Sequence, residues 1–106
     1  MAKLPIPKFN LRLSKAQKPT LISLVFRYNG KRLVYSTGYS ILPKDWDFKK
    51  QRPIAQTRRT DLFAIQRSLD DIAAYCTSIF IENDYGAIGI DAFKEHLDIR
   101  TGKTFP

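Results

Sequence analysis

The 106-residue sequence has few of the side chains on which enzyme chemistry and metal binding depend, with one Cys and one His. A Zn²⁺ site needs three or four ligands, so we interpret His96, beside Glu95 and Asp98, as a solvated helix residue. Cys76 lies in an apolar stripe, where a thiol stays protonated and inert. The glycine motifs G-x-x-x-x-G-K-[ST] and G-x-G-x-x-G are absent from the sequence. We therefore predict no catalytic residue, no metal and no cofactor.

Long apolar runs are also missing. The longest uncharged stretch within a predicted helix covers residues 72–81, whereas a membrane-spanning helix needs about 20 residues. The opening MAKLPIPKF lacks the apolar run of a secretory signal. A lone thiol also cannot form an internal disulfide. The sequence therefore predicts a cytoplasmic protein with no membrane association.

Acidic residues are scarce in the first part of the chain. Residues 1–60 carry 14 Lys or Arg and 2 Asp or Glu, whereas residues 61–106 carry 4 and 8, so the net charge of +8 divides into +12 and −4. Clustered cations attract a phosphate backbone and release its counterions. With 43% hydrophobic and 12% aromatic residues, the composition is that of one globular domain. We therefore predict that the first part binds a polyanion, nucleic acid above all.

Alternation of apolar and polar residues predicts three strands, at 9–14, 21–28 and 31–37. The last two meet across Asn29-Gly30, the pair best suited to a type I′ turn. A two-residue turn fixes the register, which places Arg27 opposite Arg32. One face then packs in the core and the other faces solvent. The predicted core face consists of Phe9, Leu11, Leu13, Ile22, Leu24, Phe26, Tyr28, Leu33 and Tyr35.

From residue 61 to about 83 the apolar period becomes that of an amphipathic helix. Its predicted stripe is Leu62, Ile65, Leu69, Ile72, Cys76 and Ile79. Gly86 is typical of a helix end, and residues 90–97 predict a short second helix. In the connector, Trp46 is predicted to cover an edge of the core.

The predicted fold class is therefore α+β, a three-stranded antiparallel β-sheet packed against a long C-terminal α-helix, with a short second helix. The predicted division is a flexible basic leader at 1–8, a folded domain at 9–99 and a linker at 100–106.

The solvent face of the predicted sheet carries the candidate binding residues. The guanidinium group of arginine can donate two hydrogen bonds to a guanine edge or a phosphate, and the side-chain amide of asparagine can pair with adenine. Arg27 opposite Arg32 is an unfavourable pair of like charges, which suggests an anionic partner. The face has no aromatic residue for base stacking, which favours duplex over single-stranded DNA. An ordinary solvated sheet face remains the alternative. The predicted DNA-binding residues are Asn10, Arg12, Ser14, Ser23, Arg27, Arg32 and Ser36, with Lys8, Lys15, Lys18 and Lys31 at the strand ends.

These features together resemble the N-terminal arm-binding domain of tyrosine recombinases, the integrases of phages and conjugative transposons, particularly those of Bacteroides-like bacteria. The resemblance covers nearly the whole chain. It depends on the strand ending in Arg12, Asn29-Gly30-Lys31-Arg32, Ser36-Thr37-Gly38, Pro43-Lys44-Asp45-Trp46-Asp47, the basic stretch to Arg59 and the long helix.

The resemblance implies that the sheet enters the major groove of double-stranded DNA at arm-type sites. It also implies a parent recombinase whose core-binding and catalytic domains follow, located with the bacterial nucleoid. The family's catalytic residues belong to that later domain, so this chain is not expected to be an enzyme. Tyr75 and Tyr85 lack a surrounding Arg cluster and are not predicted to be nucleophiles.

A protein-interaction module is the alternative function. In it, the acidic residues of the second part would contact other recombinase subunits or an accessory protein. Whichever function holds, the isolated domain is expected to be monomeric. These residues are Glu82, Asp84, Asp91, Glu95 and Asp98. DNA affinity that falls steeply with salt would favour the first function, and salt-insensitive self-association would favour the second.

Overall fold

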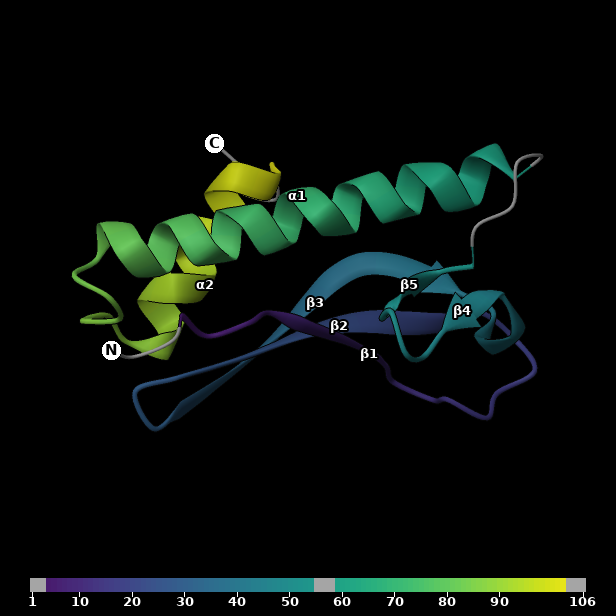
Figure 1. Cartoon of the computed structure of the whole chain (residues 1–106), viewed down its shortest axis with the longest axis horizontal. Coiled ribbons are helices and arrows are strands. Elements are labelled where there is room, and N and C mark those ends of the chain that lie inside the picture. Colours follow the sequence, from purple (N-terminus) through teal and green to yellow (C-terminus); the bar gives the residue numbers. More distant parts are fainter. Residues whose placement is uncertain (1–3, 55–58, 103–106) are drawn as a thin grey trace.

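The computed structural model describes residues 4–54 and 59–102, which form a sheet layer and a helix layer (Figure 1). The antiparallel sheet has the order β1 (Lys8–Leu11), β2 (Thr20–Tyr28), β3 (Lys31–Ile41). The helices are α1 (Thr60–Glu82) and α2 (Ile90–Thr101), and η1 (Pro43–Asp45) with the small sheet of β4 (Trp46–Asp47) and β5 (Arg52–Pro53) precedes them. The predicted α+β class, with one long and one shorter helix, is confirmed.

The hairpin of β2 and β3 has the predicted register. Asn29 and Gly30 have φ values of 48° and 76°, as a type I′ turn requires. Arg27 pairs with Arg32, and the pairing continues without a shift as far as Ser23 and Ser36. Successive side chains therefore alternate between the core and solvent over this whole stretch.

Helix α1 covers one face of the sheet, and α2 packs against α1 and β3 (Figure 1). The predicted stripe of α1 is buried except for Ile65, which is half-buried and packed against the core. Phe26 of β2 lies 5.8 Å from Phe80 and 5.6 Å from Phe93 between ring centroids, so it joins the sheet to both helices. Trp46 is also buried, as predicted. Each such side chain contributes about 1.5–3 kcal/mol by burial, so this side stabilises the sheet.

Strand β1 is shorter than predicted. Arg12 still donates its N–H to the Leu21 carbonyl at 2.9 Å, but residues 12–15 form a turn. Leu13 donates its N–H to the hydroxyl of Thr20 at 2.9 Å and accepts one from Ala16. Leu13 was predicted on the core face and is 56% exposed. That prediction was wrong because the apolar alternation continues in the sequence beyond the point where turn hydrogen bonds replace the ladder.

Strand β3 is longer than predicted, because a bulge at its predicted end allows pairing to resume. Thr37 is buried, and its hydroxyl donates to the Ile22 carbonyl at 2.8 Å. Gly38 follows with a φ of 80°, a conformation that glycine adopts without strain. The ladder then continues with Leu21 opposite Ser40.

Helix α2 runs past its predicted end at residue 97. Arg100 and Thr101, predicted in the linker, belong to the helix, and Arg100 forms an ion pair with Glu82 of α1. At the other end, Lys8 belongs to β1 rather than to the leader. Residues 4–7 of the predicted leader and Gly102 of the predicted linker are described, whereas residues 1–3 and 103–106 lie outside the described residues.

The tip of the hairpin is held by the loop between the two helices. The side-chain amide of Asn29 donates to the Tyr85 carbonyl, and the hydroxyl of Tyr28 donates to the Ile88 carbonyl, both at 2.9 Å. A Cβ atom on Gly86 would lie 2.4 Å from the amide nitrogen of Asn29 and 2.8 Å from the Phe80 ring. Asn83 caps α1, so Gly86 does not directly follow the helix, but its N–H donates to the Phe80 carbonyl at 3.1 Å. Gly86 therefore takes part in the helix end as well as in this close approach.

Candidate nucleic-acid interface

The face of the sheet opposite α1, here called the open face, carries side chains in rows that cross the strands. Antiparallel pairing brings residues of β1, β2 and β3 side by side, and alternation keeps the rows on one surface. The rows are Asn10, Ser23 and Ser36, then Lys8, Val25 and Val34, then Arg27 and Arg32. Six of the predicted binding residues therefore share one surface, on which Ser23 is half-buried and the other five are exposed.

The remaining predicted residues of the first loop lie beyond the end of β1. Arg12 continues the β1 line opposite Leu21, and Ser14 and Lys15 follow in the same turn. Lys18 lies in the bend before β2. All four are exposed, so the loop adds cations next to the polar row.

Lys31 lies on the other side of the sheet. It pairs with Tyr28, whose side chain belongs to the core face, so its own side chain points the same way. Its ammonium donates to the Ile88 carbonyl at 3.1 Å and lies 5.7 Å from the centre of the Tyr28 ring. The predicted register already implied this side, and grouping Lys31 with the solvent-face residues overlooked it.

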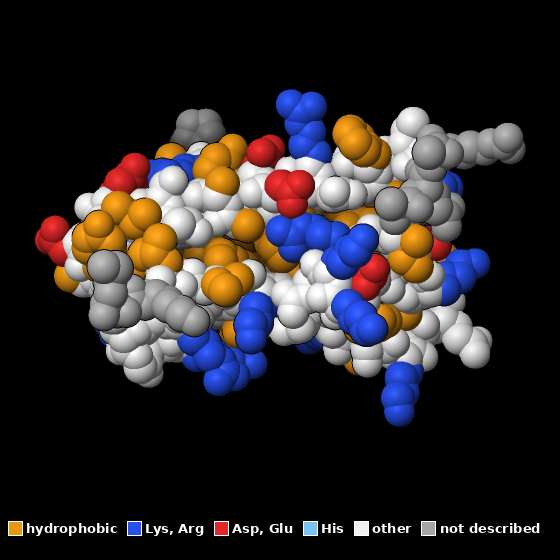
Figure 2. Space-filling model, viewed as in Figure 1, with side chains coloured by type: hydrophobic (Ala, Val, Ile, Leu, Met, Phe, Trp, Pro, Cys, Tyr) orange, Lys and Arg blue, Asp and Glu red, His pale blue; other side chains and the backbone are white. Residues whose placement is uncertain are grey.

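The arginines of the open face have no acidic partner among residues 4–54 and 59–102. The segment from residue 4 to residue 44 contains no Asp or Glu. Within the described ranges, the structure gives Arg12, Arg27 and Arg32 no carboxylate partner. Figure 2 shows Lys and Arg side chains along the lower edge of the molecule, on the sheet side, and several acidic ones above them, on the helix side. The cationic character of this face is therefore uncompensated.

Three arginines of the connector and the helices, Arg52, Arg59 and Arg100, are paired instead. Arg52 forms an ion pair with Asp70 at 2.8 Å. Arg59 contacts Asp61 at 3.0 Å and the buried Asp45 at 3.3 Å. The hydrogen bond from Arg59 holds the pKa of Asp61 below its usual value. Arg52 and Asp70 are 18 residues apart, so their pairing leaves no local signal in the sequence.

A hollow of about 580 Å³ lies at the arginine end of the open face. Its polar wall is formed by Lys8, Asn10, Arg27 and Arg32, and its apolar wall by Leu4, Ile6 and Val25. Sequence reasoning treated the leader only as a basic segment and missed Leu4 and Ile6. The signal was available, because Leu4 and Ile6 continue the period of two that places Lys8 and Asn10 on this face.

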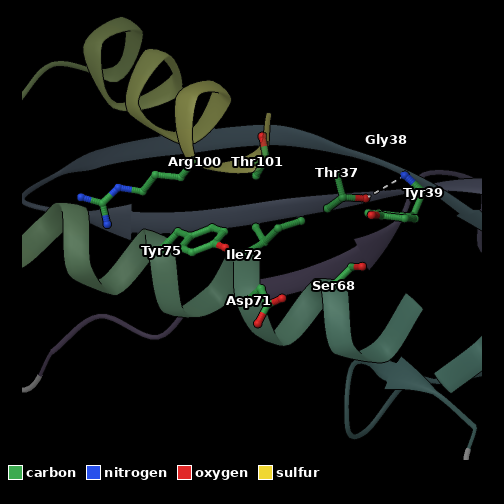
Figure 3. Close-up of a pocket in the computed structure, with 9 residues that line it drawn as sticks. All are labelled: Thr37, Gly38, Tyr39, Ser68, Asp71, Ile72, Tyr75, Arg100 and Thr101. Carbon is green, nitrogen blue, oxygen red and sulfur yellow. Dashed lines mark hydrogen bonds between the residues drawn. The ribbon is translucent and has the colours of Figure 1, made fainter. Parts of the chain in front are cut away.

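A second hollow of about 400 Å³ lies on the helix side, between β3, α1 and α2 (Figure 3). Thr37 and Tyr39 line it from β3, Ile72 and Tyr75 from α1, and Arg100 from α2. None of the predicted DNA-binding residues lines this hollow. Tyr39 is partly exposed here, so it does not add an aromatic ring to the open face.

The candidate catalytic and metal-binding residues have other surroundings. Cys76 is buried in the core, and burial raises the pKa of its thiol to about 12, in agreement with the inert role predicted for it. His96 is exposed on α2. Among residues 4–54 and 59–102, no three His, Cys, Asp or Glu side chains are grouped as a metal ion would need. In the same ranges no helix has the length and apolarity to cross a membrane.

The acidic residues proposed for protein contacts are divided between two roles. Glu82 is paired with Arg100, and Asp98 accepts a hydrogen bond from the Tyr35 hydroxyl at 2.6 Å. Asp84, Asp91 and Glu95 are exposed. Part of the acidic surface therefore holds the helices to each other and to the sheet.

Comparison with known protein families gives a match to the arm DNA-binding domain over residues 9–84. Because the match covers more than half of the chain, the chain belongs to this family, and its function is DNA binding. The matched region runs from β1 to just beyond α1, so it includes all three strands of the open face. Neither the curated proteins nor the solved structures that were compared gave a match.

Proposed function

We propose that this chain is the N-terminal domain of a tyrosine recombinase and binds double-stranded DNA at arm-type sites. The open face enters the major groove, and the parent protein supplies the catalytic domain for DNA integration or recombination at the bacterial nucleoid. The site comprises Asn10, Arg12, Ser14, Ser23, Arg27, Arg32 and Ser36, with Lys8, Lys15 and Lys18 on phosphates. Lys31 is left out because its ammonium is bound to a backbone carbonyl on the helix side.

The observation that carries the proposal is the cross-strand pair of Arg27 and Arg32. These two side chains are exposed, opposite each other and without a carboxylate partner among the described residues. Like charges in direct opposition destabilise a sheet, so the pair fits an anionic partner better than water. Arginine forks suit guanine edges and phosphates, and the major groove admits strands.

The choice of duplex DNA follows from where the aromatic rings lie. Proteins that bind single strands present rings on an exposed face for stacking on bases. Here Phe26, Tyr28 and Tyr35 are buried on the other side of the sheet. The open face offers hydrogen-bonding groups instead, which suit the edges of paired bases.

Duplex binding can be tested with substitutions that change the same charge on opposite sides of the molecule. Duplexes enriched from a random pool serve as probes, and affinity is measured at several salt concentrations. Arg27→Ala and Arg32→Ala should each weaken binding by about 5- to 150-fold, or 1–3 kcal/mol. Arg67→Ala is the matched control, since Arg67 is exposed on α1 and has no ion pair among the described residues.

The control should bind within about twofold of the unchanged chain, because surface substitutions away from a site have small effects. Amide chemical shifts should move in residues 10–14, 23–27 and 32–36 when duplex DNA is added. Shifts confined to α1 and α2 would refute the proposed face. Salt-insensitive self-association without DNA affinity would favour the protein-interaction alternative.

A further inference from the structure

The middle of the open face is apolar, although polar and charged rows flank it. Val25 is half-buried, and Val34, directly opposite it, is 40% exposed. The row on one side holds Asn10, and the row on the other side holds Arg27. A surface for phosphate alone would need no such row, since phosphates are bound by cations and by N–H and O–H donors.

The apolar row continues into the hollow described above. Val25 lies in the hollow, and Leu4 and Ile6 of the leader, 47% and 74% exposed, form its apolar wall. Lys8, Arg27 and Arg32 surround the same space with positive charge. Charge complementarity therefore points to duplex DNA as the occupant, and the apolar wall must then meet an apolar group on it.

In the major groove, the base edges offer one apolar group that a side chain can recognise, the 5-methyl group of thymine. We infer that Val25 and Val34 read thymine methyl groups, so that the site discriminates thymine from bases without a methyl group at this position. This inference rests on the proposed docking of the open face in duplex DNA. It adds two specificity residues to the arginines and asparagine already assigned.

The test removes only the methyl group from the DNA. A duplex enriched from a random pool by the unchanged chain is resynthesised with deoxyuridine in place of one thymidine at a time. At one or two positions, deoxyuridine should weaken binding by about fourfold, the value of one buried methyl group. At the sensitive position, the ratio of the affinity for the thymidine duplex to that for the deoxyuridine duplex should fall towards one in Val34→Ala or Val25→Ala.

Ile81→Ala is the matched control, because Ile81 is also 40% exposed but lies on α1. It should keep the full discrimination. The readout is a ratio of affinities for one protein sample, so a smaller folded fraction in a variant cancels. A deoxyuridine effect on DNA shape would be equal in all the proteins and so cancels as well.

The outcomes separate this inference from the proposed function. Tight, salt-dependent binding with no thymine-to-uracil difference at any position overturns the inference and leaves the proposed function standing. A difference that persists unchanged in both valine variants also overturns the inference alone. If no duplex is enriched and none binds, the proposed function fails and the inference fails with it.

Discussion

Arginine has opposite roles on the two sides of the sheet. On the open side, Arg27 and Arg32 face each other, and no carboxylate approaches them among the described residues. On the other side and in the connector, Arg52, Arg59 and Arg100 each contact at least one carboxylate. The two charges of an ion pair largely cancel each other's field. The net charge of +8 therefore does not indicate where an anion would bind until the paired residues are excluded from it. Among the described arginines without an ion pair, Arg12, Arg27 and Arg32 lie on the open face or in the loop beside it, and Arg67 lies on α1.

The two sides also differ in what holds them together. The covered side contains buried rings and aliphatic side chains, and polar contacts such as that of Asn29 with Tyr85 fix the hairpin to the helices. The open side exposes polar and charged side chains instead. Because burial supplies most of the stability, the covered side can compensate for an unfavourable pair of arginines on the open side. Substitutions on the two sides should therefore separate stability from DNA affinity.

Gly86→Ala tests the covered side most severely. Gly86 has a φ of 97°, and a Cβ atom would lie 2.4 Å from the amide nitrogen of Asn29. We expect the free energy of unfolding to fall by about 2–4 kcal/mol, from backbone strain and overpacking together. Urea unfolding of both proteins measures the difference.

Gly30→Ala is the control for backbone strain alone. Gly30 has a similar φ of 76° but nothing within 4 Å of its Cβ position. It should lose only about 1 kcal/mol. Equal losses in the two variants would mean that the close contact of Gly86 with the hairpin contributes nothing.

Tyr35→Phe tests a polar contact of the covered side through its pH dependence. Burial, then the hydrogen bond to Asp98, raises the pKa of Tyr35 from 10.0 to about 12. Because the folded state holds the Tyr35 proton more tightly than the unfolded state, the hydroxyl contributes its full stabilisation below pH 10. This contribution is lost as the pH rises towards 12. The variant should be less stable by about 1–2 kcal/mol at neutral pH and should lose less stability than the unchanged chain above pH 10.

Urea unfolding at a series of alkaline pH values measures this change. Both proteins share the loss from Cys76, whose pKa is also raised to about 12, so the difference between them isolates Tyr35. Tyr85→Phe, at a tyrosine that is 60% exposed, should follow the unchanged chain. DNA affinity at neutral pH should not change in Tyr35→Phe. A parallel loss of affinity would show that the covered side takes part in binding.

The register of the hairpin could be predicted because Asn29-Gly30 fixes it locally, and the rows of the open face follow from it. The buried stripe of α1 could be predicted for a similar reason, since the helical spacing of its apolar residues is visible within a short stretch of sequence. Leu13 could not be placed correctly, because the hydroxyl of Thr20, several residues away, replaces the ladder there.

The pairing of arginines needed the fold. Arg52 meets Asp70 and Arg100 meets Glu82 only after the chain has folded. Sequence spacing gives no signal for contacts of this range. The predicted site did not include Arg52 or Arg100, but only the fold shows that its own arginines have no carboxylate partner among the described residues.

Arg52→Ala should reduce stability, unlike the arginine variants of the open face. Its guanidinium pairs with Asp70 at 2.8 Å and lies 4.7 Å from the centre of the Phe9 ring. We expect a loss of about 1 kcal/mol, since both contacts are partly solvated. Arg67→Ala removes an arginine of α1 that has no ion pair among the described residues, so it should change stability by less than about 0.5 kcal/mol. An equal effect of the two substitutions on urea unfolding would remove the distinction between paired and unpaired arginines.

The smallest expected effect has the opposite sign. Arg27→Ala or Arg32→Ala removes one of two like charges in direct opposition, so stability should rise by a few tenths of a kcal/mol (about 0.2–0.5). Salt screens exposed charges, so the gain should shrink when urea unfolding is repeated at about 1 M salt. The same variants should bind DNA more weakly, because each lacks one guanidinium group that would contact phosphate or guanine in the complex. A loss of stability in both variants, independent of salt, would mean that the pair has a structural role, and the contrast between the two sides of the sheet would fail.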